Sequence, residues 1–310
     1  MGTRAQGMAG AFVAVADDAT ATWWNPAGLA SGAYFSGVIE RGALNDPGTP
    51  SNAGPARRDA ASGLAITVPS LGLSYYHLQV GEVRPLSSPI GGTGAVRQDD
   101  GAASVELRTL SLNRFGVTIG QSFTPHFVIA STLALLRGGV SGSTEAAGPS
   151  AVDDAINLDV TNETHGDIDL GAMVKAGVLR LGVNVKHMTQ PTFGTGTSSM
   201  TLARQARAGI ALETHAAGAP FTVSGDVDLS KTPTVNGDAQ HIAAGIEAWL
   251  ANRRIGARGG VSANLVGEKR TSASSGLSLA FKTGLYVDGA LTYGSDTTRS
   301  GWSVTLRATY

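Results

Sequence analysis

Cysteine is absent from this chain of 310 residues, which excludes disulfides, thiolate metal sites and cysteine nucleophiles. Charged residues are scarce: they make up 15% of the chain, against about a quarter in soluble globular domains. The formal net charge of −1 gives no general attraction to nucleic acid, so no nucleic-acid partner is expected. Apolar runs long enough for an α-helical membrane span, about eighteen residues, are also missing. The first residues lack the pattern of a signal peptide, so an exported protein would carry one upstream or have lost it.

The most extensive pattern in the sequence is an alternation of apolar and polar residues that begins after Ser31. In the last such run, Trp302, Val304 and Leu306 alternate with polar residues. A slip of the apolar phase near Asn113 predicts a bulge in the fourth run. Counting these runs predicts roughly fourteen strands, at 32–41, 61–69, 71–79, 107–121, 125–139, 166–176, 178–189, 200–214, 219–230, 239–251, 253–265, 272–282, 284–293 and 300–310.

The connections between these strands alternate between long and short, and the strand number is even. This arrangement is typical of outer-membrane barrels, with both ends of the barrel on the short-turn side. A soluble β-sandwich would show the same alternation. Three features favour the barrel: long strands, small residues on the polar faces, and aromatic residues that we expect to form interfacial girdles: Tyr75, Tyr76, Trp249, Tyr293, Trp302 and Tyr310. The sequence therefore predicts an all-β fold, a transmembrane antiparallel β-barrel of about fourteen strands.

A barrel of that size has a lumen too wide for side chains to fill, because eight strands already enclose just enough room for them. The lumen must therefore hold water or a plug. Residues 1–30 are compact, rich in Gly and Ala and poor in charge. We therefore predict two parts: an N-terminal plug at 1–30, inside the lumen of an outer-membrane barrel at 31–310.

The N-terminal segment also resembles the hatch of the FadL/TodX family. The resemblance lies in residues 7–29 and is strongest at Ala16-Asp17-Asp18-Ala19 and Asn25-Pro26-Ala27. The family consists of outer-membrane transporters of long-chain fatty acids and other hydrophobic compounds in Gram-negative bacteria. The resemblance implies ATP-independent uptake with lateral exit through the barrel wall. The chain is short for a fatty-acid transporter, and shorter relatives include assembly or secretion partners, which is the alternative function.

The resemblance also suggests partners for the chain. These are membrane lipid, a hydrophobic small-molecule ligand, and the barrel-assembly machinery, which reads a terminal aromatic strand similar to the one that ends at Tyr310. We expect a monomer in the bacterial outer membrane. No cofactor and no metal is expected.

Several residues of the segment are candidates for function. We expect Met8, Phe12, Trp23 and Trp24 to bind substrate, although a Trp pair can equally anchor the plug to the wall. Plug or gate residues are predicted at Asp17, Asp18, Asn25, Pro26 and Ala27. The two carboxylates either bind a cation or form a switchable contact, or they cap a short helix or accept backbone N–H groups. The Asn-Pro step either fixes a turn or acts as a hinge.

Charged residues on the polar faces are expected to pair across the lumen and to hold the plug: Arg180, Lys186, Arg204, Arg207, Asp226, Asp228, Glu247, Arg258 and Lys282. A basic subset of them is a candidate for contact with a substrate carboxylate. An enzyme is the least favoured interpretation. The six histidines lack metal-ligand spacing, and no G-x-S-x-G or P-loop motif occurs.

Overall fold

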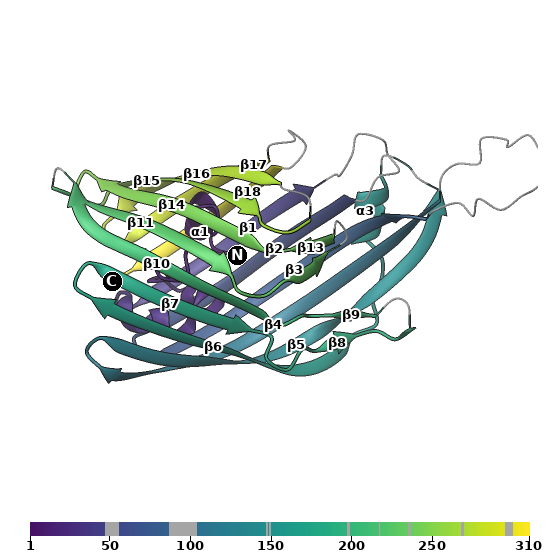
Figure 1. Cartoon of the computed structure of the whole chain (residues 1–310), viewed down its shortest axis with the longest axis horizontal. Helices are drawn as coiled ribbons and strands as arrows, with labels where there is room; N and C mark the ends of the chain where they lie inside the picture. The colour runs from purple at the N-terminus through teal and green to yellow at the C-terminus, as the bar shows by residue number, and fades with distance from the viewer. Residues whose placement is uncertain are drawn as a thin grey trace, which may run out of the picture.

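The computed structural model describes residues 1–46, 56–86, 104–146, 148, 150–196, 199–216, 218–234, 237–267, 270–294 and 300–310. Its main feature is a closed antiparallel barrel of fourteen strands, in which each strand pairs with its neighbours in the sequence and β1 pairs with β18 (Figure 1). The predicted all-β fold, an antiparallel barrel of fourteen strands, is thus confirmed.

The barrel strands fall close to the predicted runs, although β2, β3, β4 and β5 extend further toward the long connections. They are β1 (Ser36–Asp46), β2 (Ala56–Val68), β3 (Leu71–Pro85), β4 (Ser104–Thr124), β5 (Phe127–Ala146), β6 (Glu163–Ala176), β7 (Leu179–Lys186), β10 (Gln205–Ala216), β11 (Ala219–Asp228), β14 (His241–Leu250), β15 (Ile255–Asn264), β16 (Thr271–Lys282), β17 (Leu285–Gly294) and β18 (Ser300–Thr309).

Short turns join the strands at one end of the barrel and long connections join them at the other. Val68 pairs with Leu71 across one such turn, and Ser36 pairs with Thr309 at the same end. The barrel therefore begins and ends on the short-turn side, as the even strand number predicts. Parts of the long connections lie outside the described residues.

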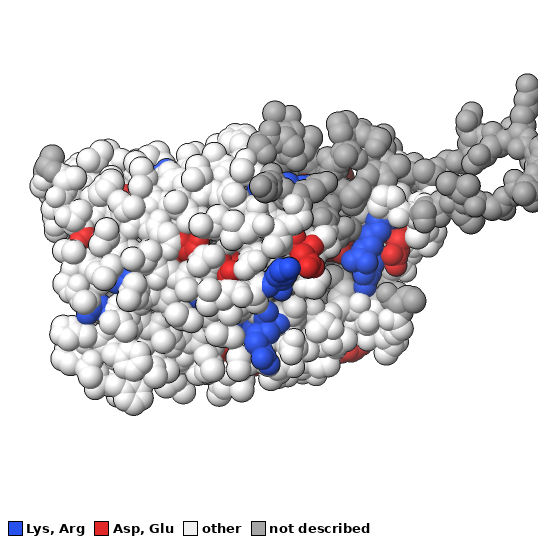
Figure 2. Space-filling model, viewed as in Figure 1, with Lys and Arg blue, Asp and Glu red and all other residues white. Residues whose placement is uncertain are grey.

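The outer wall of the barrel carries the apolar side chains of the alternating strands. Leu277, Val304 and Leu306 are about half exposed there, at 47%, 47% and 54%. Lys, Arg, Asp and Glu occupy only a small part of the face seen in Figure 2. This surface suits contact with lipid tails and not with water, and the closed barrel rules out the soluble sandwich. No helix in the described part of the chain is both long and apolar enough to cross a membrane.

Three local predictions were wrong. The pairing of β4 is continuous through Asn113, with a register shift only at Ser122/Thr124, so the predicted bulge is absent at Asn113. Tyr76 and Trp249 are buried inside the barrel and do not belong to an outer aromatic girdle. Among the charges expected in the lumen, Arg204 and Lys282 are exposed at strand ends.

Smaller elements lie at the long-connection end. Helix α3 (Ala151–Ile156) packs against β2, β3 and β4, on the face that continues the outer wall. The hairpin of β8 (Thr192–Phe193) and β9 (Met200–Thr201) packs against inward-facing apolar residues of β3, β4 and β5 and buries Phe193 completely. A second hairpin, β12 (Thr232–Thr234) with β13 (Gly237–Ala239), lies in the connection between β11 and β14.

Candidate functional site

Residues 1–29 are buried or half-buried inside the barrel (Figure 1). They form α1 (Thr3–Gly7), α2 (Ala21–Trp24) and the 3-10 helix η1 (Pro26–Ser31). These elements are too short to be stable alone, because isolated helices of fewer than about 12 residues are marginal in water. Tertiary contacts must therefore hold residues 1–31, called the N-terminal segment below.

A buried ion cluster joins the N-terminal segment to the barrel. Arg4 contacts Glu247 of β14 at 2.7 Å, and on its other side it contacts Asp17 at 2.5 Å and Asp18 at 2.8 Å. Arg258 of β15 contacts Glu247 at 2.6 Å, so this carboxylate lies between two guanidinium groups. Because the charges are removed from water, each depends on its partners for stabilisation.

Backbone groups of the N-terminal segment also find partners on the barrel wall. The amides of Phe12 and Val13 both donate to one carboxylate oxygen of Asp226 in β11, each at 2.8 Å. The carbonyl of Ala11 accepts a hydrogen bond from the hydroxyl of Ser224 at 2.7 Å. Irregular backbone inside the lumen thus has its polar groups satisfied by inward-facing wall residues.

Glycines on the inner wall let this backbone approach closely. An added Cβ at Gly245 of β14 would lie 2.8 Å from Met8, and one at Gly182 of β7 would lie 2.7 Å from the carbonyl oxygen of Val13. At Gly276 of β16 an added Cβ would lie 3.2 Å from the Cα of Gly7. The segment therefore lies against the wall on several sides with no room for a larger side chain between them.

The structure separates the four residues expected to bind substrate. Met8 and Phe12 have no exposed surface and pack inside the N-terminal segment with Ala5, Val15 and Leu29. Trp23 and Trp24 lie on the surface of the segment and line a cavity. Of the four candidates, the structure thus brings the two indoles to a site that a ligand can reach.

The two acidic residues make different contacts. Asp18 is buried and accepts hydrogen bonds from the amide of Thr20 at 2.9 Å and from its hydroxyl at 2.5 Å, at the start of α2. Burial acts to raise the pKa of Asp18, but the nearby Arg4 and Arg307 guanidinium groups and the Thr20 hydrogen bonds outweigh it, so the pKa is lowered. Asp17 is more exposed and contacts the same Arg4. Asp18 thus accepts hydrogen bonds in a turn, and both carboxylates form ion pairs with Arg4.

The Asn25-Pro26-Ala27 step links the segment to β6. The side-chain NH2 group of Asn25 donates to the carbonyl of Val13 at 2.9 Å and to that of Ala172 in β6 at 3.2 Å. The side-chain oxygen of Asn25 accepts a hydrogen bond from the backbone N–H of Ala27 at 3.1 Å. Pro26 occupies the first turn of η1, where a missing N–H costs nothing. In this structure the step is a fixed turn.

A cavity of about 340 Å³ lies above the N-terminal segment and opens toward the long connections. Val13, Trp23 and Trp24 contribute to its lining from the segment, and Asn184 and Lys186 of β7 from the wall. Trp23 meets Tyr76 edge-on at 5.4 Å between ring centroids, and Trp24 lies 5.6 Å from the Arg207 guanidinium. The indoles are therefore both anchored to the wall and open to the cavity.

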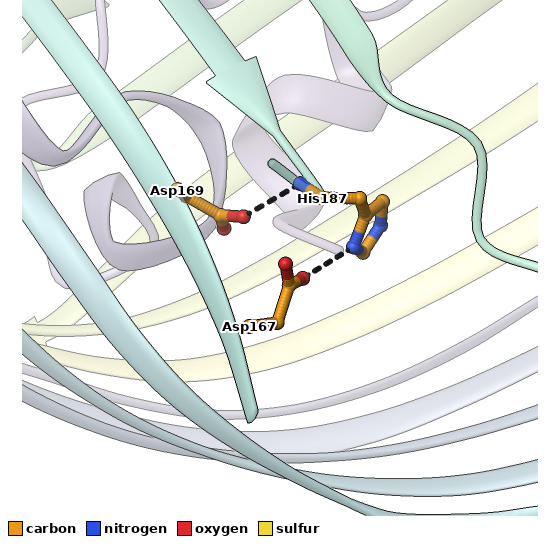
Figure 3. A group of neighbouring side chains, drawn as sticks. All are labelled: Asp167, Asp169 and His187. Carbon is orange, nitrogen blue, oxygen red and sulfur yellow. Dashed lines mark hydrogen bonds and ion pairs between the residues drawn. The ribbon is translucent and has the colours of Figure 1, made fainter. Parts of the chain in front are cut away.

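A further cluster, Asp167, Asp169 and His187, was not predicted. The side chains lie at the adjoining ends of β6 and β7 (Figure 3). His187 Nδ1 is 2.7 Å from Asp167, its backbone amide donates to Asp169 at 3.1 Å, and Arg114 pairs with Asp169 at 2.5 Å. One ligand atom from each of the three residues lies within 4.8 Å of the others, a spacing that could suit a metal ion, yet both carboxylates already have protein partners. The sequence signal for this cluster is the Asp-x-Asp spacing, which puts two carboxylates on the same face of a strand.

Comparison with solved structures shows which barrels share this arrangement. The CymD monoaromatic hydrocarbon channel is 12% identical, with a TM-score of 0.67 over 100% of this chain and 97% of CymD. The Ralstonia pickettii toluene transporter TbuX is 12% identical (TM-score 0.65; 100% and 98% covered), and a Pseudomonas aeruginosa FadL homologue is 13% identical (0.62; 100% and 98%). No protein-family model and no curated protein matches the chain. The predicted resemblance to FadL/TodX barrels is thus confirmed in the fold.

Proposed function

We propose that this protein is a passive channel of the bacterial outer membrane that takes up hydrophobic or amphipathic organic compounds, and that residues 1–31 plug it. The observation that supports this proposal most is the cavity above the N-terminal segment, which is open toward the long connections and has two indoles in its lining. The apolar outer wall supports placement in a bilayer. The similar barrels named as a hydrocarbon channel and a toluene transporter support the substrate class.

The exit route is part of the same proposal. The resemblance suggests that substrate leaves sideways through the wall. The strand β3 keeps a continuous register with both β2 and β4. Lateral exit at β3 would therefore require neighbouring strands to separate during transport. Recognition by the assembly machinery through the strand ending at Tyr310, and a monomeric state, belong to the proposal as expectations.

The alternative, an assembly or secretion partner of the same fold, predicts a lumen filled throughout. The open cavity favours transport over this alternative. We also propose that the protein is not an enzyme, since the similar barrels carry the names of channels and transporters.

Deletion of residues 1–31 tests the plug. Liposomes that contain the deleted protein should leak small sugars much faster than liposomes that contain the full chain. Correct folding of both barrels is checked by their heat-dependent mobility on a gel. Equal leakage from two folded barrels would contradict the plug, and failure of the full chain to speed uptake of labelled toluene or oleate would contradict the transport function.

A further inference from the structure

One cation beside the cavity lacks the partner that its neighbours have. Four basic side chains line the cavity, and three of them form ion pairs: Arg57 with Asp59 at 2.8 Å, Arg207 with Asp228 at 2.6 Å and Arg270 with Asp46 at 2.9 Å. Lys186 is the fourth. Among the described residues it has no carboxylate within 4.0 Å, although it is only 7% exposed. Its ammonium group instead lies 3.0 Å from the centroid of the Trp23 ring.

The surroundings of Lys186 compensate its charge only in part. A buried charge is costly unless an opposite charge or hydrogen bonds offset the loss of water. Asp169 lies nearby but is paired with Arg114 at 2.5 Å, and Asp167 is bonded to His187. The face of an aromatic ring attracts a cation, but more weakly than a buried carboxylate does. An anion that enters the cavity would supply the missing partner.

A second polar group lies beside the ammonium. Asn184 stands two residues before Lys186 on β7, so both side chains point to the same face. It is 5% exposed, lines the cavity, and its side-chain oxygen has no hydrogen-bond partner within the described residues. Next to these groups, Trp23 and Trp24 also line the cavity. A cation, an unpaired amide and two indoles thus meet in one place.

From this juxtaposition we propose that the cavity binds a small organic anion with a flat apolar body, such as an aromatic carboxylate. Lys186 contacts the anionic group, Asn184 donates to it through the NH2 group of its side chain, and Trp23 and Trp24 line the space for the ring. The cavity volume of about 340 Å³ lies near the lower limit of ligand pockets, which run from about 300 to 1,000 Å³, and so suits a single-ring compound. This proposal rests on the proposed uptake function and gives it a substrate class distinct from a neutral hydrocarbon.

The test is a binding measurement by calorimetry on the full chain in detergent. Four probes of related shape separate the contributions: benzoate, neutral toluene, cationic benzylamine, and acetate, which keeps the charge without the ring. We expect benzoate to bind at least about tenfold more tightly than the other three, equal to about 1.4 kcal/mol. Wild-type protein that binds toluene or acetate as tightly as benzoate, or that binds no probe, overturns the proposal.

Variants then assign the effect to Lys186. Lys186→Met keeps the length of the side chain and removes the charge, so benzoate should bind at least about tenfold more weakly while toluene binding stays the same. Lys186→Arg should restore most of the benzoate affinity. Lys282→Met is the matched control, because Lys282 is exposed at the short-turn end outside the cavity. Unchanged benzoate binding in Lys186→Met would overturn the proposal, and if that variant fails to fold, the four-probe comparison on the wild type decides.

Failure of the proposed function would look different. Benzoate binding that depends on Lys186, without benzoate flux into proteoliposomes, would support the binding site and contradict transport. Flux of toluene without benzoate binding would support transport and contradict the binding site.

Discussion

Arg4 and Glu247 form a two-point ion pair between the N-terminal segment and β14. The Nε atom of Arg4 donates to one carboxylate oxygen at 3.0 Å, and a terminal nitrogen donates to the other at 2.7 Å. The pair joins residues 243 positions apart in the sequence, and both are almost fully buried. It is therefore a long-range contact whose loss should act directly on the position of the segment.

Replacing Arg4 with Met should loosen the N-terminal segment. Removing one partner of a buried pair typically costs about 3–5 kcal/mol. Arg258 still neutralises Glu247, but Asp17 and Asp18 lose their contact with Arg4, so we expect a cost within this range. Solute leakage through proteoliposomes should rise toward that of the protein without residues 1–31. Arg254→Met, at an exposed turn, is the control and should leave leakage unchanged. A tight barrel in Arg4→Met would show that the ion pair does not hold the segment.

The glycines on the inner wall allow a second test of how the N-terminal segment is held, by steric clash instead of loss of charge. Gly245→Val should push Met8 away from β14, because even the first added carbon would lie 2.8 Å from it. Gly289→Val adds the same side chain to the outer face of β17, where no atom lies within 4 Å of the added carbon. We expect leakage to increase in the first variant and to stay at the wild-type level in the second. Single-channel recordings in planar bilayers would measure both.

Much of the barrel could be predicted from the sequence because strands that face lipid on one side and the lumen on the other must alternate. Strand β17 was expected at 284–293 and lies at Leu285–Gly294. The prediction of a bulge near Asn113 was wrong because the inner face of β4 is itself apolar just beyond Arg114, toward the long-connection end of the strand. Leu110 and Leu112 pack there under Phe193, so residues on both faces read as apolar.

The candidate site was harder to predict, since it depends on which groups meet in space. Lys186 could be named as a lumenal charge from its place on a polar face. Its lack of an acidic partner depends on Arg114 taking Asp169, a contact between residues 55 positions apart. Alternation places a side chain inside the barrel but does not reveal its neighbours. Likewise, Met8 and Phe12 could be recognised as apolar, but only the packing of the segment shows that they face its interior.

The lowered pKa of Asp18 predicts how the segment responds to acid. A carboxyl whose pKa is lower in the folded state stabilises the fold at pH values above its unfolded pKa, near 3.8, and this stabilisation is lost as the pH falls through the folded value. Asp18 should therefore add nothing to leakage between about pH 8 and pH 5 and should contribute to it only in stronger acid. Asp18→Asn keeps the shape without the charge and should leak already at neutral pH. Leakage of Asp18→Asn equal to that of the wild type at neutral pH would contradict this assignment.

Leu277, midway along β16, tests whether the outer wall faces lipid tails. The residue is 47% exposed and points away from the lumen. An arginine near the bilayer midplane on the lipid face of a barrel costs about 2–4 kcal/mol, and the cost falls to about 0–1 kcal/mol near the interfaces. Leu277→Arg should therefore lower the unfolding free energy in bilayers by about 2–4 kcal/mol. Thr271→Arg, at the exposed start of the same strand, should change it by less than about 1 kcal/mol. Urea titration of the protein in liposomes measures both, and equal small effects would mean that this wall does not cross the hydrocarbon core.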